Sequence, residues 1–529
     1  MPVGDHPAGR LEKGMSSTSS MHVDGESDGR VVPVKGPNKG GQPSAEGLEG
    51  RGPTKENIEQ PTPPRTQSRP SESRGLVGVR EVARKDKRTR FTALLHHVTV
   101  RRLLESFDAL KRDAAPGVDG VTWREYETDL VARVTSLHGR LHQGTYRAQP
   151  SKRAYIPKAD GRQRPLGIAA LEDKIVQHAV VVVLNAIYEE DFLGFSYGFR
   201  PERSQHDALD ALIVGISGTQ VNWILDADIR SFFDAVSHSW LVRFLGHRIG
   251  DPRLLRLIQK WLQAGVLEDG VVTVSEMGTG QGSVISPLLA NVYLHYVFDL
   301  WAQRWRRREA VGDMIILRYA DDIVVGFERE ADARRFWDAM RERLLEFALS
   351  LHPDKTRLLA FGRFAAARRA RCGLGKPETF DFLGFTMICG RSRSGGFLVQ
   401  RKTRRDRMQA KLKEIKEGLR RRRHQPIPEQ GTWLKRVVTG YFAYHAVPTN
   451  NRALGSFRHH VARLWRRSLR RRSQRSRATW DRMDRLAAVW LPKPRILHPW
   501  PQQRFAVKHP RWEPYAGMPH VRICAGGAR

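Results

Sequence analysis

Two adjacent carboxylates, Asp321 and Asp322, lie between two short apolar runs, Ile315–Leu317 and Ile323–Phe327. Apolar runs that flank a short turn predict a β-hairpin with buried arms, and this hairpin would carry both acids at its tip. Neighbouring anions repel each other unless a cation lies between them and a further acid. The pattern therefore predicts a Mg²⁺ site, although paired aspartates in ordinary turns are common.

A further acid is expected from another strand, because a two-metal site clamps the attacking and leaving oxygens of a displacement between ligands from separate elements. The segment 223–234 supplies the candidates, after a strand-like run that begins at Trp223. They are Asp226, Asp228 and Asp234. Spacing alone does not choose among them, and a solvated strand end is the alternative for two of the three.

Phosphate recognition is suggested by the segment 155–168, in which Lys and Arg side chains stand on both sides of an Asp160-Gly161 turn. Cations on the two arms of such a hairpin could hold a triphosphate, since Lys and Arg neutralise transferring phosphates. An ordinary surface turn is the alternative when the Lys-x-Asp-Gly sequence is taken alone.

The composition favours a nucleic-acid partner. The formal net charge is +34, from 90 Lys+Arg against 56 Asp+Glu, and a polyanion would relieve the resulting self-repulsion. An unselected, Arg-rich composition is the alternative.

Cys372, Cys389 and Cys524 form no C-x-x-C pair, which gives almost no support for a zinc site or a disulfide framework and fits a reducing cytoplasm. The most apolar stretch, 175–187, is too short and interrupted to span a bilayer and predicts a buried helix.

Composition divides the chain into four segments. Residues 1–80 are rich in Gly, Ser, Pro and charge, and we expect disorder because they could not bury enough apolar surface to offset their ordering entropy. Residues 81–390 alternate strand-like and amphipathic helical runs, which predicts a mixed α/β core. Residues 391–480 are strongly basic and predict a separate helical unit. Residues 481–529 are rich in Pro, Trp and His and predict a small, irregular, basic region.

The two acidic segments together resemble the palm motifs of reverse transcriptases encoded by bacterial group II introns. In that family a Gly/Ala-Asp-Ile-Lys/Arg run is followed by Phe-Asp, which matches residues 227–234, and Tyr-Ala-Asp-Asp matches residues 319–322. The resemblance implies an α+β fold, in which the fingers and palm of a right-hand polymerase precede an α-helical thumb or maturase domain. It assigns Asp228, Asp321 and Asp322 as the catalytic acids and as Mg²⁺ ligands, together with the backbone carbonyl of Ile229. Asp226 and Asp234 would then be structural.

The same resemblance assigns the contacts of an incoming dNTP. Lys158 and Arg164, on the fingers hairpin, would grip the triphosphate, and the Phe233 ring would exclude a 2′-hydroxyl from the sugar site. Gln281 would lie near the template pair, in a Thr-Gly-Gln-Gly loop where Thr-Pro-Gln-Gly is more usual. Lys355 would approach a primer or nucleotide phosphate. An ordinary core phenylalanine and an ordinary surface lysine are the alternatives for Phe233 and Lys355.

Residues 433–472 resemble the maturase domain of the family, whose arginines lie next to aromatic side chains and could bind phosphates and stack on bases. A solvated basic helix is the alternative. The candidates for RNA binding are Arg466, Arg467, Arg470, Arg471 and Arg472.

The region 481–529 could hold target DNA through Trp490, Trp500 and Trp512. A packed structural cap is the alternative. Many relatives end in a His-Asn-His endonuclease with paired cysteines, and such pairs are absent from this sequence. We therefore expect no DNA-cleaving domain.

Together these features predict an RNA-directed DNA polymerase that uses Mg²⁺ and dNTPs, binds group II intron RNA to assist its splicing and mobility, and contacts target DNA. The expected location is the bacterial cytoplasm, and the nucleoid when target DNA is bound. Tyr-Ala-Asp-Asp and Phe233 argue against a viral RNA-dependent RNA polymerase. A splicing-only maturase and a retron-type reverse transcriptase are the alternatives, and the intact acids count against the first. The oligomeric state is left open.

Overall fold

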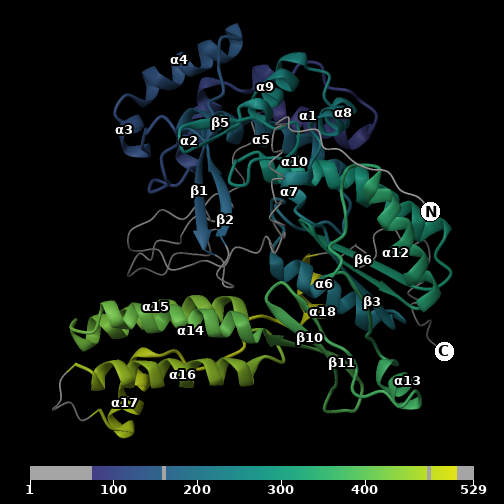
Figure 1. The fold of residues 1–529 in the computed structure, drawn as a ribbon, viewed down its shortest axis with the longest axis vertical. Coiled ribbons are helices and arrows are strands. Elements are labelled where there is room, and N and C mark those ends of the chain that lie inside the picture. Colours follow the sequence, from purple (N-terminus) through teal and green to yellow (C-terminus); the bar gives the residue numbers. More distant parts are fainter. Residues whose placement is uncertain (1–73, 158–162, 473–477, 509–529) are drawn as a thin grey trace, which may run out of the picture.

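The computed structural model describes residues 74–157, 163–472 and 478–508 (Figure 1). Helix α1 (Arg74–Lys85) begins inside the segment 1–80, so the expectation of disorder is wrong for residues 74–80. Leu76 and Ala83 of this helix are fully buried, and α1 packs on the long helix α5 (Leu171–Asp191). The rest of that expectation, for residues 1–73, lies outside the described residues.

The fingers contain a four-stranded sheet of order β2-β1-β4-β5 with helices beside it (Figure 1). The predicted fingers hairpin is confirmed, because β1 (Ser151–Pro157) pairs antiparallel with β2 (Gln163–Ile168). Its tip, residues 158–162, lies outside the described part of the chain. The predicted buried helix at 175–187 is also confirmed as the centre of α5. The other elements of this part are η2 (Leu95–His97), α2 (Val100–Ala109), α3 (Trp123–Glu127), α4 (Leu130–Gln143), α8 (His238–Gly246), α9 (Pro252–Gln263), β4 (Val266–Glu268) and β5 (Val271–Thr273).

The palm sheet has the order β6-β7-β3-β8, and each neighbouring pair is antiparallel. Alternate side chains point to two different cores: Leu225 and Val325 pack with α5, α10 and α12, whereas Ile224 and Val324 pack with α6. Strands that are buried on both faces need nearly continuous apolar sequence, which explains the two apolar runs around the acids. The elements are α6 (Gln205–Gly218), β3 (Trp223–Asp228), α7 (Phe232–Ala235), α10 (Ser286–Leu294), η3 (His295–Asp299), α11 (Leu300–Arg308), β6 (Met314–Tyr319), β7 (Asp322–Phe327), α12 (Glu330–Leu345), β8 (Arg357–Ala360) and α13 (Ala365–Arg371).

The segment 391–480 is not entirely helical, which corrects the predicted boundary. A third sheet of order β11-β10-β9 joins β9 (Phe380–Phe382) to the hairpin of β10 (Phe385–Arg391) and β11 (Phe397–Thr403). Val399 of β11 belongs to the core under α6, so this hairpin packs with the palm. The helical unit begins at α14 (Arg405–Arg421) and continues with α15 (Ile427–His445) and α16 (Asn451–Arg470) (Figure 1). The predicted order, an α/β core followed by a helical region, is confirmed.

The described part of the C-terminal region contains two packed helices, which flank the irregular segment 491–500. Helix α17 (Trp480–Trp490) contributes Met483 and Ala487 to the core of the helical unit. Helix α18 (Pro501–Lys508) packs on α6 of the palm, where Arg504 lies 3.2 Å from Asp210. These contacts favour the structural-cap alternative for residues 478–508, and contact with target DNA stays a prediction. Within the described residues no helix combines the length and apolarity needed to cross a membrane.

Candidate active site

The turn that carries the paired acids lies at the tip of the β6–β7 hairpin, as predicted. Tyr319 and Asp322 face each other across the two strands, so Ala320 and Asp321 form the turn itself. Ala320 has a φ of 56°, which lies in the left-handed region that side chains other than glycine rarely adopt. Asp321 is buried, with 2% of its surface exposed. The hairpin therefore presents its acids from a tight and unusual turn.

Strand β3 brings the third predicted acid to the same place. Asp228 stands directly opposite Asp322 in the antiparallel β3–β7 pair, and Cβ atoms at such positions are about 5 Å apart. Asp226, two residues earlier, has an oxygen 3.4 Å from a guanidinium nitrogen of Arg357 on β8. The structure thus places Asp228 beside Asp322, which directly follows Asp321 in the chain, and it pairs Asp226 with Arg357. The catalytic role of the three acids stays a prediction.

The segment after α12 closes around the end of β3. The backbone amide of His352 donates to the carbonyl of Asp228 at 2.8 Å, and Lys355 Nζ lies 3.2 Å from Asp228 Oδ2. The Lys355 side chain is 29% exposed, so it is a half-buried neighbour of a catalytic candidate rather than an ordinary surface lysine. Its contact with a nucleotide or primer phosphate stays a prediction.

The donor set suits Mg²⁺, because three carboxylates offer hard oxygen ligands from two strands. Among the residues that the structure describes, no three His, Cys, Asp or Glu side chains are grouped closely enough to hold a metal ion. Ile229, the predicted backbone ligand, is buried and forms an isolated β-bridge with Leu351.

The predicted sugar-site residue lies on the short helix α7. Phe233 is 8% exposed, and its ring is in edge contact with Phe232 at a centroid distance of 5.4 Å. The Thr279 amide donates to the Phe233 carbonyl at 2.7 Å, and the Gly167 amide donates to the Gln281 carbonyl at 2.6 Å. The Gln281 loop therefore bridges α7 and β2. Burial alone does not separate a sugar-site ring from an ordinary core ring.

The triphosphate contacts are only partly described. Arg164 is in β2, paired with Ile156, so its backbone lies on the strand that the Gln281 loop contacts. Lys158 lies outside the described residues.

Comparison with known proteins decides the family. The sequence profile described as "Reverse transcriptase (RNA-dependent DNA polymerase)" matches residues 156–387, which contain both acidic segments. Protein YkfC of Escherichia coli is 34% identical over 319 residues, which cover 54% of this chain and 78% of YkfC. This chain belongs to the reverse transcriptase family. It is an RNA-directed DNA polymerase.

Shorter matches connect this reverse transcriptase with intron proteins. The group II intron-encoded protein LtrA of Lactococcus lactis subsp. cremoris is 42% identical over 164 residues, which cover 31% of this chain and 27% of LtrA. An uncharacterized 91 kDa protein in the cob intron of Schizosaccharomyces pombe is 43% identical over 146 residues, or 28% of this chain and 18% of that protein. The chain therefore spans well under half the length of these intron relatives.

Two residues contact the catalytic turn although the sequence alone did not predict it. Arg318 is fully buried and donates to the carbonyl of Ala320 at 3.0 Å. A Cβ atom on Gly198 would come within 2.3 Å of the Ala320 nitrogen. A lone arginine inside the apolar run before Tyr319 was an available signal, because an unpaired buried charge is costly. The partner of Gly198 could not be known from the sequence.

The predicted RNA-binding arginines divide into two groups. Arg466 donates to the Ala478 carbonyl at 2.9 Å and its guanidinium lies 4.6 Å from the ring centroid of Trp480, so it joins α16 to α17. Arg472 donates to the His424 carbonyl at 3.3 Å. Arg467, Arg470 and Arg471 are exposed. RNA binding stays a prediction, and these three exposed cations are its better candidates.

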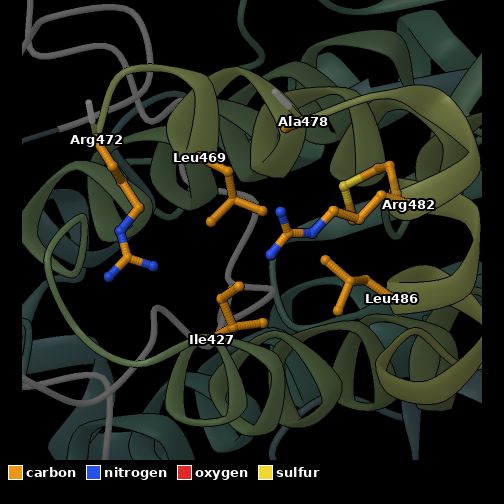
Figure 2. Close-up of a pocket in the computed structure, with 7 residues that line it drawn as sticks. Ile427, Leu469, Arg472, Ala478, Arg482 and Leu486 are labelled. Atoms are coloured by element: carbon orange, nitrogen blue, oxygen red, sulfur yellow. The ribbon is translucent and has the colours of Figure 1, made fainter. Parts of the chain in front are cut away.

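The helical unit also contains a cavity of about 190 Å³ between α15, α16 and α17 (Figure 2). Its walls combine apolar side chains such as Ile427, Leu469 and Leu486 with the guanidinium groups of Arg472 and Arg482. It lies far from the palm acids in the fold, so it is not part of the polymerase site (Figure 1).

Proposed function

We propose that this reverse transcriptase is encoded by a group II intron, copies that intron's RNA into DNA with Mg²⁺ as cofactor, and binds the RNA as a maturase. One observation carries the intron assignment: a strongly basic helical unit follows directly after the palm. On its helix α16 the exposed residues Arg452, Arg463, Arg467 and Arg470 recur at spacings of eleven, four and three. Such spacings place side chains on one helical face, and a stripe of cations can replace the counterions around an RNA backbone.

The names of two relatives give further support. LtrA is named as a group II intron-encoded protein, and the Schizosaccharomyces pombe relative is named for its place in an intron. Both matches cover only part of this chain. The match to YkfC covers more of the chain, and its name states no intron. A reverse transcriptase with a cellular role outside an intron is therefore the second candidate.

For DNA synthesis, the residues of this chain would have three tasks. Asp228, Asp321 and Asp322 would hold Mg²⁺, which when bound polarises the phosphoryl group and neutralises developing charge. Lys355, beside Asp228, would orient a phosphate of the primer or nucleotide. The buried Phe233 would exclude the 2′-hydroxyl of an rNTP.

The intron assignment is tested with the RNA that flanks the coding sequence. Protein and transcript are combined at low Mg²⁺, and binding and splicing are compared with those of an unrelated structured RNA of equal length. We expect tighter binding to the flanking RNA and protein-dependent splicing. Equal affinity for both RNAs, with no splicing, would favour the second candidate while leaving the polymerase activity intact.

The surface assignment is tested with the triple variant Arg467→Gln, Arg470→Gln and Arg471→Gln. Its matched control is Arg304→Gln, Arg307→Gln and Arg308→Gln, which removes the same charge from α11. Weaker RNA binding by the first triple alone is the expected result. Equal weakening by both would indicate only a general charge effect.

A further inference from the structure

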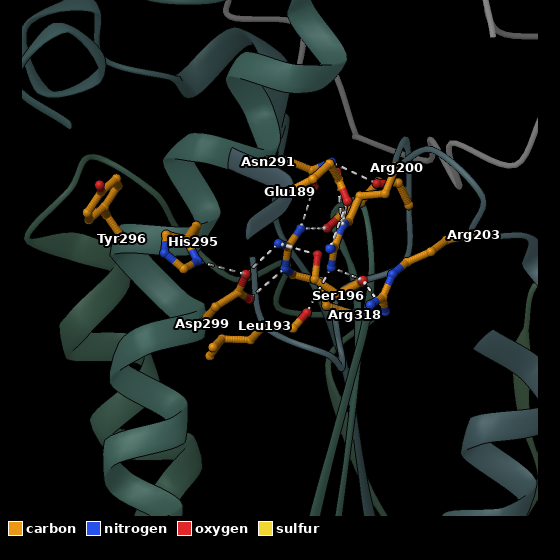
Figure 3. Close-up of polar contacts among 12 residues, drawn as sticks. Glu189, Leu193, Ser196, Arg200, Arg203, Asn291, His295, Tyr296, Asp299 and Arg318 are labelled. Atoms are coloured by element: carbon orange, nitrogen blue, oxygen red, sulfur yellow. Dashed lines mark hydrogen bonds and ion pairs between the residues drawn. The ribbon is translucent and has the colours of Figure 1, made fainter. Parts of the chain in front are cut away.

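Arg318 lies on β6, three residues before Asp321, and is fully buried (Figure 3). Its guanidinium donates to both carboxylate oxygens of Asp299, at 2.7 and 2.6 Å, and to Asn291 Oδ1 at 2.9 Å. It also donates to Ser196 Oγ at 2.7 Å and to the Ala320 carbonyl at 3.0 Å. An arginine has five N–H donors, and here each one has an acceptor.

Filling the core at this position would not require a buried arginine with five hydrogen bonds. A buried ion pair contributes little net stability compared with apolar side chains of similar volume, because both charges must leave water. The planar guanidinium can, however, reach several acceptors at once in a fixed geometry, which a lysine cannot do. The Arg318 guanidinium therefore links the Asp299 carboxylate rigidly to the Ala320 carbonyl.

The link acts on the residue that shapes the catalytic turn. Ala320 has the left-handed φ of 56° and directly precedes Asp321. Its carbonyl is held by Arg318, and its nitrogen faces Gly198 so closely that no Cβ could fit between them. The loop that carries Gly198 is fixed in turn, because Asn291 Nδ2 donates to the Gly198 carbonyl at 2.7 Å. The turn is thus clamped from two sides.

The consecutive helices α10, η3 and α11 carry Asn291 and Asp299, the two side chains that hold the Arg318 guanidinium. Helices α10, η3 and α11 follow one another without a break, and η3 is a π-helical turn at His295–Asp299. Asn291 and Asp299 are eight residues apart, which would separate them by about 80° around an ideal α-helix. A π turn contains more residues than an α turn and so reduces this offset. Both side chains can therefore face Arg318.

We propose that Arg318, set by Asp299 and Asn291, is a positioning residue for DNA synthesis: it fixes the Ala320 carbonyl so that Asp321 and Asp322 hold the orientation that the polymerase reaction needs. Because Arg318 is fully buried, in this role it would act through Ala320 and not by contact with the substrate. The proposal rests on the polymerase activity alone and is independent of any intron partner.

Arg248 provides a matched control. It is also buried, its guanidinium lies 2.9 Å from the carboxylate of Asp191 at the end of α5, and it donates to the carbonyls of Asp86 and Thr89 at 3.0 and 2.9 Å. None of these partners belongs to the β6–β7 hairpin or to the loop that carries Gly198. Arg248→Lys therefore perturbs a similar buried pair without releasing Ala320.

The experiment compares Arg318→Lys with Arg248→Lys on an RNA template with a DNA primer. We measure kcat, KM for dNTP and for primer–template, melting temperature, and hydrogen exchange of the peptide 318–323 without added metal. Arg318→Lys should lower kcat by about 10- to 100-fold, because small misplacements of reacting groups have effects of this size. Its KM for primer–template should not change, and exchange of the turn peptide should be faster. Arg248→Lys should keep kcat within about threefold of wild type, since the turn stays clamped.

Wild-type kcat in Arg318→Lys would overturn the proposal, as would equal losses of kcat and melting temperature in both variants. If Arg318→Lys does not fold, Ser196→Ala replaces it, because this change removes a single acceptor of the guanidinium. A several-fold fall in kcat with faster exchange of the turn is then expected. Unchanged kcat and exchange in Ser196→Ala would equally overturn the proposal.

Discussion

The substitution Gly198→Ala tests how closely the catalytic turn is packed. The new Cβ would lie 2.3 Å from the Ala320 nitrogen, 2.9 Å from the Tyr319 carbonyl carbon and 3.0 Å from the Ala320 Cα. All three are backbone atoms, so no side chain can rotate away to make room. The loop and the hairpin tip would have to separate by about 1 Å to regain ordinary contact, because protein interiors have no spare volume.

The size of the effect follows from that displacement. Overpacking of this kind costs about 1–3 kcal/mol of unfolding free energy, which most folded proteins tolerate. A misplacement of about 1 Å at reacting groups can lower a rate about 100-fold, which corresponds to about 2.7 kcal/mol of activation free energy. We therefore expect a folded Gly198→Ala protein whose kcat falls about 100-fold while its KM for primer–template is unchanged.

Primer extension on an RNA template, at saturating dNTP and with the active fraction titrated, measures this kcat. Gly139→Ala on α4 is the control, because nothing lies within 4 Å of its added Cβ. That variant should match wild type in rate and be as stable or more so. Full kcat in folded Gly198→Ala would refute the reasoning, since it would mean that the acids do not depend on the position of the turn.

Three further predictions concern the sugar site, the RNA surface and pH. Phe233→Val should admit rNTPs in competition assays with dNTPs, and an unchanged preference would make Phe233 an ordinary core residue. The triple change of Arg467, Arg470 and Arg471 to Gln should reduce the slope of log affinity for RNA against log salt by up to about 2 or 3, since each lost phosphate contact removes nearly one counterion; an unchanged slope would place the RNA elsewhere. Burial raises the pKa of Asp173 to about 6 from 3.8, so the folded state binds more protons than the unfolded state between these values, and the free energy of unfolding should fall as pH rises through this window. Asp173→Asn should remove that part of the pH dependence in urea melts, and identical pH profiles for both proteins would contradict the assignment.

The parts of the site that the sequence predicted are those encoded locally. The β6–β7 hairpin follows from two apolar runs around Asp321 and Asp322, and the pairing of β1 with β2 was predicted from the Asp160-Gly161 sequence between cationic arms. The pairing of Asp228 with Asp322 needed the family resemblance, because no local pattern sets which strand lies beside β7.

The parts that were missed depend on contacts between distant segments. Gly198 and Ala320 are far apart in the sequence, and only the folded chain shows that their backbones touch. Residues 74–80 of α1 were included in the disordered segment because of the composition of residues 1–80, and the packing of this helix on α5 appears only in the folded chain. Strand β11 was included in the helical segment because basic residues dominate that segment's composition, whereas its pairing with β10 and the core under α6 decide its structure.

The measurement that tests the central claim most directly is DNA synthesis on an RNA template by wild type, Asp321→Asn and Asp226→Asn. Asp321→Asn keeps the side-chain volume and removes one charge from the buried turn residue. Asp226→Asn makes the same change on β3, at an acid paired with Arg357. If Asp321 is a catalytic acid and Asp226 is not, we expect extension with dNTPs by wild type and by Asp226→Asn, and none by Asp321→Asn at unchanged RNA affinity. Extension by Asp321→Asn at the wild-type rate would contradict it.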